Sequence, residues 1–337
     1  TIREFGVTQL FGSPALVAVL AKFGQPLAGV KRITSAGAPV PADIVARMRE
    51  LMDADAQLWT PYGATECLPV AVIEARELET TRELTERGAG TCVGRPVPRN
   101  RVRIIPITDA AISEWSDDLA LPTGQLGEIT VSGPSATDAY FRRPEATVLA
   151  KIRESVDGVE HIVHRMGDLG YFDAEGRLWF CGRKSQRVVV NDGSTLCTEQ
   201  VEPVFDVHPD VRRSALVGVG ASGAQTPVLC VELNAGVAKA RQAGIVDELR
   251  HLERLGLRHD TLVARAARHA VEALAVDGNH AHVQRTRHAP QVLGPRVVAL
   301  GVDIDLAHRL GPLPQAARHC VETDQAFHAF FVFFRGR

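Results

Sequence analysis

Hydrophobic runs in the first part of the chain are divided by glycine, proline and polar residues into alternating helices and strands. Residues 13–24 predict a helix in which Ser13 is the N-cap and Gly24 ends the last turn. The same pattern predicts a strand at 31–36, a helix at 41–52 and a strand at 56–59. Such alternation is typical of a parallel, doubly wound sheet, which binds ligands at the carboxyl ends of its strands.

Two short segments follow these predicted strands, Gly37-Ala38-Pro39 and Tyr62-Gly63-Ala64-Thr65-Glu66. The second segment combines an aromatic ring, a hydroxyl and a carboxylate. A magnesium nucleotide needs these groups for base stacking, for a phosphate oxygen and for the metal. A plainer interpretation is a turn in which Gly63 only permits the bend. Because both segments follow strand ends, we favour a ligand site.

From Gly88 the pattern changes to short β-rich runs separated by glycine and proline, such as 101–105, 127–131 and 176–180. This spacing predicts a small barrel or sandwich. A junction over 182–199 then leads to a second α/β piece. Its expected elements are a helix at 200–205 and strands at 214–219 and 227–233.

The stretch 236–337 changes character again, with no lysine after Lys239 and many arginines, alanines and histidines. A helical extension, a disordered tail and translation of GC-rich DNA in a wrong frame are three explanations that stay open. We favour the last, because no periodic pattern for a core persists. The histidine spacing repeats no metal-ligand pattern, which argues against a metal site there.

Length and charge narrow the class of protein. A chain of 337 residues with 45% apolar residues is long enough for two domains, and its net charge of −2 argues against a nucleic-acid-binding surface. No apolar run approaches the roughly 20 residues that span a bilayer. Six scattered cysteines without a CxxC pair predict a reducing, cytoplasmic setting. The start at Thr1, without an initiator Met, predicts a partial chain.

Two further charged residues are candidates for a nucleotide site. Asp168 follows Gly167 just before a strand-like segment, where backbone approaches a ligand closely, and a carboxylate is a natural acceptor for a ribose diol. Arg183 follows Gly182 and has a guanidinium that donates to ribose or phosphate oxygens.

In this order the segments resemble the motifs of adenylate-forming enzymes, which include acyl-CoA synthetases, adenylation domains and luciferases. The resemblance spans about residues 1–235 and rests on five segments: 37–39, 62–66, 127–133 with Tyr140, 165–169 and 182–188. Within that family the chain most resembles the β-lactone synthetases of bacterial olefin biosynthesis, on segments 60–69 and 191–194.

The resemblance implies a mixed α/β fold with a large domain, made of a parallel α/β layer and a small β-barrel, followed by a small α+β domain. The expected ranges are 1–87 and 88–182 for the large domain, 183–235 for the start of the small one, and 236–337 unassigned. A hinge between the domains is implied around Lys184-Ser185. Ser185 stands where the family usually has an acidic residue or lysine.

The resemblance also implies a role for each candidate. Gly37, Ala38 and Pro39 would border the adenine, and Tyr62 would stack on it. Thr65 would contact the α-phosphate and Glu66 would hold Mg²⁺. Asp168 would bind the ribose hydroxyls, with Arg183 beside it.

The implied reaction joins ATP and a long-chain fatty or β-hydroxy fatty acid into an acyl-AMP, with Mg²⁺ and release of pyrophosphate. Attack by the substrate's own β-hydroxyl would then close a β-lactone. The enzyme would work in the cytoplasm, in assembly with other olefin-pathway enzymes. A fatty acyl-CoA synthetase or acyl-AMP ligase, and an inactive nucleotide-binding fragment, are the alternatives.

The family's glycine-rich phosphate loop and its C-terminal lysine have no counterpart in this sequence. We therefore expect the chain as written to be inactive or severely impaired. Apolar residues at 68–72 are candidates for lining the acyl pocket, although apolar residues after a strand are more often core.

Overall fold

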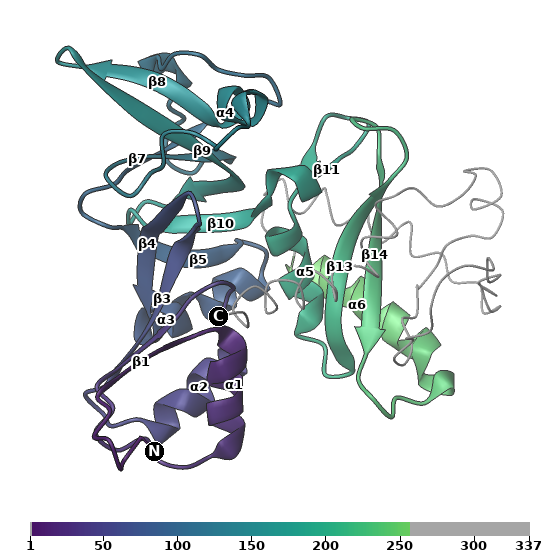
Figure 1. Cartoon of the computed structure of the whole chain (residues 1–337). Coiled ribbons are helices and arrows are strands. Elements are labelled where there is room, and N and C mark those ends of the chain that lie inside the picture. Colours follow the sequence, from purple (N-terminus) through teal and green to yellow (C-terminus); the bar gives the residue numbers. More distant parts are fainter. Residues whose placement is uncertain (1, 257–337) are drawn as a thin grey trace, which may run out of the picture. The chain divides into compact units, whose positions relative to one another are not determined.

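The computed structural model describes residues 2–256, which fold into two compact units. One unit consists of residues 2–85 and 89–185. The other, among the described residues, consists of the short segment 86–88 and residues 186–256. In Figure 1 the first unit runs from purple to teal, and the described part of the second runs from teal to yellow-green. Each unit has its own hydrophobic core.

The first unit begins with a parallel sheet and two helices. Strands β1 (Gln9–Gly12), β2 (Arg32–Ser35) and β3 (Gln57–Ala64) pair in parallel, and α1 (Pro14–Phe23) and α2 (Ala42–Leu51) connect them. The Ser13 hydroxyl accepts the N–H of Leu16, and Gly24 takes the left-handed conformation at the other end, which confirms the predicted helix.

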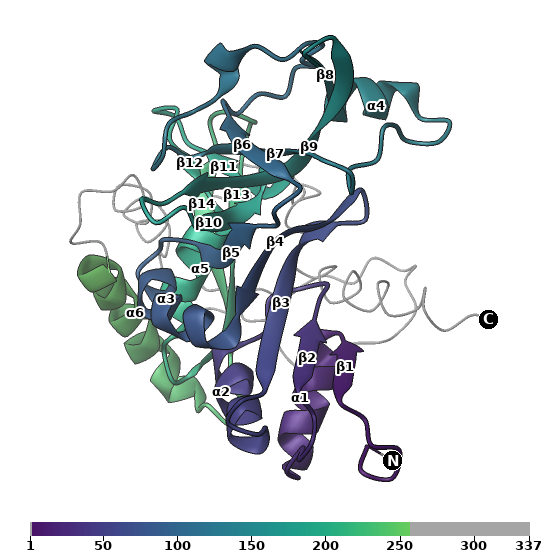
Figure 2. The same ribbon diagram turned by 90° about the vertical axis from the view of Figure 1, so that its left-hand side faces the viewer.

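Both helices cover the same face of this sheet, as Figures 1 and 2 show. Ile33 and Leu58 point from the strands into a core that Val17 of α1 and Met48 of α2 complete. Residues that alternate with them, such as Trp59, therefore point to the opposite face.

Strand β3 is longer than the predicted strand at 56–59. Tyr62 and Ala64 pair in antiparallel register with β4 (Cys67–Glu74), so that Tyr62-Gly63-Ala64 belong to a strand and only Thr65 and Glu66 form the turn. Pairing with β4 keeps this segment extended where the sequence indicated a turn. Helix α3 (Ala75–Glu86) follows.

The β-rich part continues the same sheet. Its strands pair in antiparallel register and give a ten-stranded sheet in the order β1-β2-β3-β4-β5-β10-β9-β7-β6, with β8 paired to β9. The mixed α/β class is confirmed. The run expected to form a small barrel or sandwich is hydrogen-bonded to the parallel part through β4 and β5. The new elements are β5 (Thr91–Pro96), β6 (Arg101–Ile105), η1 (Asp117–Leu119), β7 (Gly127–Ser132), α4 (Pro144–Ala150), β8 (Lys151–Val156), β9 (Val159–Phe172) and β10 (Leu178–Arg183).

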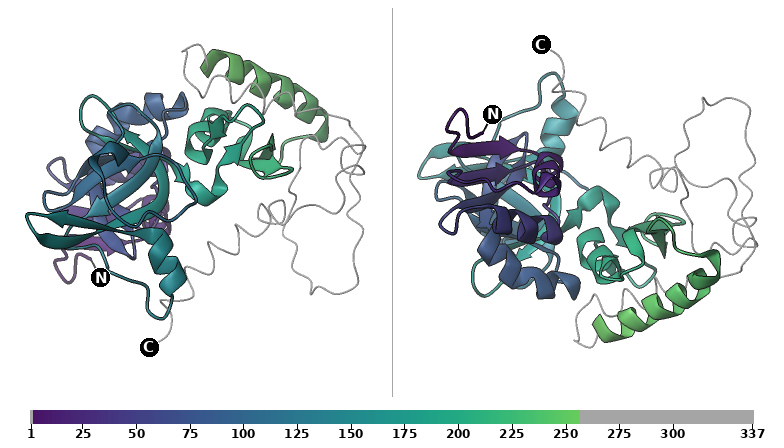
Figure 3. Two further views of the ribbon diagram at one scale, coloured as in Figure 1. Left: turned by 90° about the horizontal axis from the view of Figure 1, so that it is seen from above. Right: turned by 90° about the horizontal axis from the view of Figure 1, so that it is seen from below.

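The second unit packs helices against a two-stranded sheet. Pro203 lies inside α5, and Phe205 of that helix is fully buried with Leu216 and Leu229 of the strands. Figure 3 shows the long α6 beside α5. The change from the first unit to the second falls within η2 (Lys184–Gln186). The elements that follow are β11 (Val188–Val189), β12 (Thr195–Leu196), α5 (Thr198–Asp206), β13 (Val211–Val219), β14 (Thr226–Leu233), η3 (Lys239–Arg241) and α6 (Gln242–Gly256).

Helix α6 lies in the stretch for which the sequence showed no pattern for a core. Its residues Ile245, Val246 and Leu249 are buried in the core of the second unit. Their spacing of one and four residues is that of a helix face, but three residues are too few to show the pattern in the sequence. Residues 242–256 are therefore part of the fold, and the expectations for 257–337 fall outside the described residues. Among residues 2–256, no helix is long and apolar enough to cross a membrane.

A buried ion pair joins β7 to β9 in the first unit. Arg165 and Glu128 are 3% and 1% exposed, and Arg165 Nη2 lies 2.6 Å from Glu128 Oε2. The guanidinium also donates to the carbonyls of Thr108, Ala110 and Leu149. Its donors are thus used within the protein, as burial of a charge requires.

Replacement of Arg165 by methionine leaves the Glu128 carboxylate buried with Lys184 as its remaining cationic partner. We expect Arg165→Met to lower the free energy of unfolding by about 3–5 kcal/mol, measured by urea denaturation. The exposed Arg47–Glu50 pair provides a control, and Arg47→Ala should change stability by less than about 1 kcal/mol. Equal losses in the two variants would contradict this account.

Candidate nucleotide-binding site

Three strands bring Tyr62, Asp168 and Arg183 together at one edge of the first unit. The Tyr62 hydroxyl donates to Asp168 Oδ2 at 2.7 Å, although 106 residues separate them. Arg183, in cross-strand register with Asp168, places Nη1 3.1 Å from Asp168 Oδ1. The Tyr62 ring packs against Phe180 with centroids 5.7 Å apart. The structure thus joins three of the predicted site residues.

The Asp168 carboxylate is buried, and its hydrogen bonds are incomplete. It is 2% exposed, and Oδ1 has no partner in hydrogen-bond geometry among the described residues, despite the nearby Arg183 charge. Burial raises the pKa of Asp168, and the Arg183 charge and the Tyr62 hydroxyl offset part of that rise. An acceptor in this state suits a ligand that brings its own hydroxyl donors.

The β3–β4 turn carries Thr65 and Glu66. Thr65 is exposed, and Glu66 accepts a hydrogen bond from the Tyr140 hydroxyl through Oε1 at 2.9 Å. Burial acts to raise the pKa of Glu66, but its backbone N–H, the Tyr140 hydroxyl and nearby positive charge outweigh it and lower the pKa. The carboxylate is therefore ionised, which suits a hard cation.

Gly37-Ala38-Pro39 forms a bend just beyond β2. Thr34 of β2 pairs with Trp59 of β3, so Gly37 and Tyr62 each stand three residues beyond a registered pair. Because the two strands are parallel, this bend and Tyr62 lie at the same edge of the sheet. Gly37 has a φ of 105°, which favours glycine, and the bend makes no hydrogen bond to Tyr62 or Asp168.

A hollow of about 480 Å³ lies on the face of the sheet that α1 and α2 do not cover. Of the residues proposed for an acyl pocket at 68–72, Leu68, Pro69 and Val72 line this hollow, whereas Val70 and Ala71 are buried in the core. The other lining residues are Phe11, Arg32, Thr34, Ala36, Trp59 and Pro61. The wall is thus mostly apolar and adjoins the strand that carries Tyr62.

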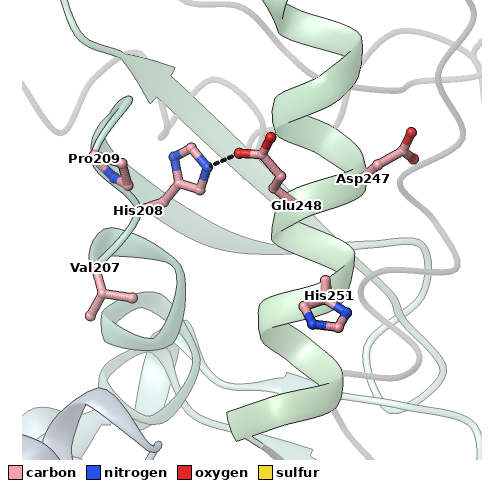
Figure 4. Close-up of a pocket in the computed structure, with 6 residues that line it drawn as sticks. All are labelled: Val207, His208, Pro209, Asp247, Glu248 and His251. Atoms are coloured by element: carbon pink, nitrogen blue, oxygen red, sulfur yellow. Dashed lines mark hydrogen bonds and ion pairs between the residues drawn. The ribbon is translucent and has the colours of Figure 1, made fainter.

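The second unit has a hollow of similar volume between α6 and the loop after α5 (Figure 4). His208 accepts the Asp210 N–H at Nδ1 and faces Glu248 through Nε2 at 2.9 Å. Arg241 contacts both oxygens of Glu248 at 2.7 Å. These contacts hold α6 in place. Because His208, Glu248 and Arg241 are paired with one another, we assign this hollow a structural role and no ligand.

Residues 1–141 match the family model described as "AMP-binding enzyme". An olefin β-lactone synthetase of Xanthomonas campestris pv. campestris is 62% identical over 270 residues, which are 80% of this chain and 48% of that relative. The chain belongs to the AMP-binding family of adenylate-forming enzymes. A second olefin β-lactone synthetase, from Stenotrophomonas maltophilia, is 67% identical over 236 residues, or 70% of this chain and 43% of the relative.

The chain spans about half the length of these curated relatives. The 270-residue match is longer than the range 1–235 over which the motifs resemble the family, so the similarity extends past residue 235. Among solved structures, an amide bond synthetase of Marinactinospora thermotolerans has a TM-score of 0.59 at 28% identity and covers 78% of this chain and 48% of that one. An o-succinylbenzoate CoA synthetase of Bacillus subtilis, in complex with ATP and magnesium, shares the fold with a TM-score of 0.53 at 22% identity, over 73% and 46%.

Three side chains near Glu66 were given no role from the sequence. Tyr140 belongs to a family motif, but its hydrogen bond to Glu66 spans 74 residues. Lys151 and His164 face each other in the register of β8 and β9, and both are buried. Both strands carry several other charged residues, so the sequence offered no signal that singles out Lys151 and His164.

His164 supplies a pH test of this region. Burial, and then the Lys151 charge, lower the pKa of His164 from 6.5 to about 4. In the unfolded chain the histidine takes up a proton near pH 6.5, so the unfolded state binds more protons between pH 6.5 and 4. The free energy of unfolding should therefore fall as pH is lowered through this window, by up to about 1.4 kcal/mol per pH unit from this residue.

His164→Asn retains a donor for the Ala150 carbonyl, which Nδ1 approaches at 3.3 Å, and cannot titrate. Its stability should fall less steeply from pH 7 to pH 4.5 than that of the unmodified chain, in denaturation series at matched salt. Parallel curves would show that His164 titrates normally.

Proposed function

We propose that this chain carries the nucleotide site of an enzyme that activates a fatty or β-hydroxy fatty acid as an acyl-AMP, releases pyrophosphate, and then forms a β-lactone in long-chain olefin biosynthesis. The observation that carries the proposal is the buried Asp168 carboxylate, which Tyr62 and Arg183 orient and which keeps Oδ1 without a hydrogen-bond partner. Relatives named olefin β-lactone synthetases, at 62% and 67% identity, support the choice of product.

In this proposal Asp168 accepts a ribose hydroxyl through Oδ1, and Arg183 neutralises the carboxylate. The ring of Tyr62 and the bend at 37–39 border the adenine, and Thr65 contacts the α-phosphate. Glu66 would hold Mg²⁺ through its carboxylate. Mg²⁺ is commonly bound by one or two carboxylates together with substrate phosphates, which fits a site with one such carboxylate, and it supplies charge neutralisation at the phosphates.

The proposed chemistry has two displacements. The substrate carboxylate attacks the α-phosphorus of ATP and pyrophosphate leaves. The β-hydroxyl oxygen then attacks the acyl carbonyl, its proton is lost, and AMP leaves with the closing of the four-membered ring. Because nucleophile and electrophile belong to one molecule, high effective molarity offsets part of the ring strain. The apolar hollow with Leu68 and Trp59 is the proposed place for the start of the acyl chain.

The hinge also remains a proposal. Lys184 Nζ lies 3.0 Å from both Glu128 Oε2 and the Thr108 carbonyl, within the first unit. The change from the first unit to the second comes directly afterwards, between Ser185 and Gln186. Rotation between half-reactions would then pivot beyond Lys184. A cytoplasmic location is also proposed, since the sequence has no disulfide pattern. Assembly with other olefin-pathway enzymes completes the proposal.

The ribose contact can be tested by binding alone. Affinities for ATP and 2′,3′-dideoxy-ATP are measured by calorimetry for the chain and for Asp168→Ala. The unmodified chain should bind ATP about tenfold or more tightly than the dideoxy analogue, because each lost hydrogen bond to a charged group is worth about 1.5–3 kcal/mol. Asp168→Ala should bind the two nucleotides equally. The exposed Glu160→Gln is the matched control, and a preference for ATP that persists in Asp168→Ala would contradict the assignment.

The product can be tested in a chimera. Residues 1–235 of this chain replace the equivalent segment of the Xanthomonas campestris relative, and ATP, Mg²⁺ and a long-chain β-hydroxy acid are supplied with and without CoA. We expect pyrophosphate release and a β-lactone in both cases, and Asp168→Ala should abolish most of it. A thioester as the product would favour an acyl-CoA synthetase, and no adenylation by a folded chimera would favour a silent nucleotide-binding role. The chain alone is expected to release pyrophosphate far more slowly.

A further inference from the structure

Lys151, the first residue of β8, is a buried cation close to the Glu66 turn. The residue is 7% exposed, and its ammonium donates to both oxygens of Thr137, the backbone carbonyl and, at 3.1 Å, the hydroxyl. It also lies 5.8 Å from the centre of the Tyr140 ring. Burial of a charged lysine is costly unless its ammonium is hydrogen-bonded. The segment 133–140, which supplies those hydrogen bonds, is therefore the place to look for the role of Lys151.

The segment 133–140 holds Glu66 at two points. The Thr137 N–H donates to the Glu66 carbonyl at 2.8 Å, and the Tyr140 hydroxyl donates to its carboxylate at 2.9 Å. A β-bridge between Cys67 and Ala136 adjoins the first of these contacts. Both groups that fix Glu66 therefore sit on one short segment, and Lys151 binds that segment at Thr137, the same residue that holds the Glu66 backbone.

The charge of Lys151 also acts on Glu66. Its charge is among the influences that favour the ionised Glu66 carboxylate. Burial lowers the pKa of Lys151, and the Glu66 charge opposes that shift. His164, opposite Lys151 in the strand register, also favours the ionised carboxylate when it is protonated, although burial lowers its pKa to about 4. Lys151 thus holds the segment that contacts Glu66 and carries a charge that favours the ionised carboxylate.

We propose that Lys151 is a positioning residue for metal-nucleotide binding: through Thr137 and Tyr140 it fixes the Glu66 carboxylate that would hold the nucleotide's divalent cation. This inference rests on the proposed function and adds a residue to it. A lysine that only stabilised the loop would affect folding without any dependence on the metal. A lysine that touched phosphate would affect binding with and without metal.

The test compares Lys151→Met, Lys151→Arg and the full chain, with Lys31→Met as a matched control at an exposed lysine. Affinity for ATP is measured by calorimetry with Mg²⁺ and again with EDTA, and Mn²⁺ bound in the presence of ATP is counted by electron paramagnetic resonance. Lys151→Met should weaken metal-dependent binding by about tenfold, as loss of a residue that orients a metal ligand typically does. Its affinity in EDTA should stay within about twofold of the unmodified chain's, by the same principle. Lys151→Arg should recover most of the loss, and Lys31→Met should show none.

Unchanged metal-dependent affinity in a folded Lys151→Met variant would overturn the inference, and so would equal weakening with and without metal. Where Lys151→Met gives no cooperative melt, Thr137→Val replaces it, because this variant removes one of the two oxygens that Lys151 binds. It should show a smaller loss confined to the metal-dependent binding, and no such loss would overturn the inference. Failure of the unmodified chain to bind ATP under either condition would instead reject the proposed function itself.

Discussion

Two buried carboxylates fix the end of strand β10, and the arrangement of the first unit depends on how they are neutralised. Asp168 of β9 pairs with Arg183, and Glu128 of β7 pairs with Lys184, the next residue along the chain. Arg165 completes the second pair. Neither carboxylate tolerates burial without these cations, so β7, β9 and β10 must meet in one register. The same requirement places Arg183 at Asp168, which Tyr62 also contacts, close to the end of the first unit at Ser185.

The fold was predictable where local signals and tertiary pairing agree. Ser13 and Gly24 carry cap chemistry that acts within a few residues, and α1 ends where they indicate. Strand β3 shows the opposite case, because Tyr62-Gly63-Ala64 have turn-like composition but pair with β4. The partner strand decided the conformation, and no local pattern contains that information. A helical extension was one of three explanations for this stretch, and the sequence did not locate helix α6 for a related reason: three buried residues are too few to show a period, and only the core identifies them.

The candidate site divides in the same way. Asp168 and Arg183 lie on adjacent strands, and their meeting follows from the pairing of β9 with β10. Their chemistry was visible because a carboxylate and an arginine each follow a glycine. The clamp on Glu66 was not visible, since Tyr140 and Thr137 belong to a loop and Lys151 begins the next hairpin. Loop residues reach a distant turn only through the sheet's full topology. Family resemblance supplied the names of the motif residues, whereas the structure supplied the second layer that supports them.

The two acidic residues of the site differ in a way that suits different ligands. Glu66 lies partly exposed with a lowered pKa, so it is a ready anion for a hard cation. Asp168 is buried with a raised pKa, because burial outweighs the Arg183 charge and the Tyr62 hydrogen bond, and Oδ1 has no hydrogen-bond partner among the described residues. A ribose diol that donates to Oδ1 would supply the missing hydrogen bond and lower that pKa again. Nucleotide binding would then relieve an electrostatic cost that is already present in the folded chain. The Tyr62–Glu66 hairpin joins both environments on one short connection, so a metal at Glu66 and a ribose at Asp168 would be held at a fixed separation.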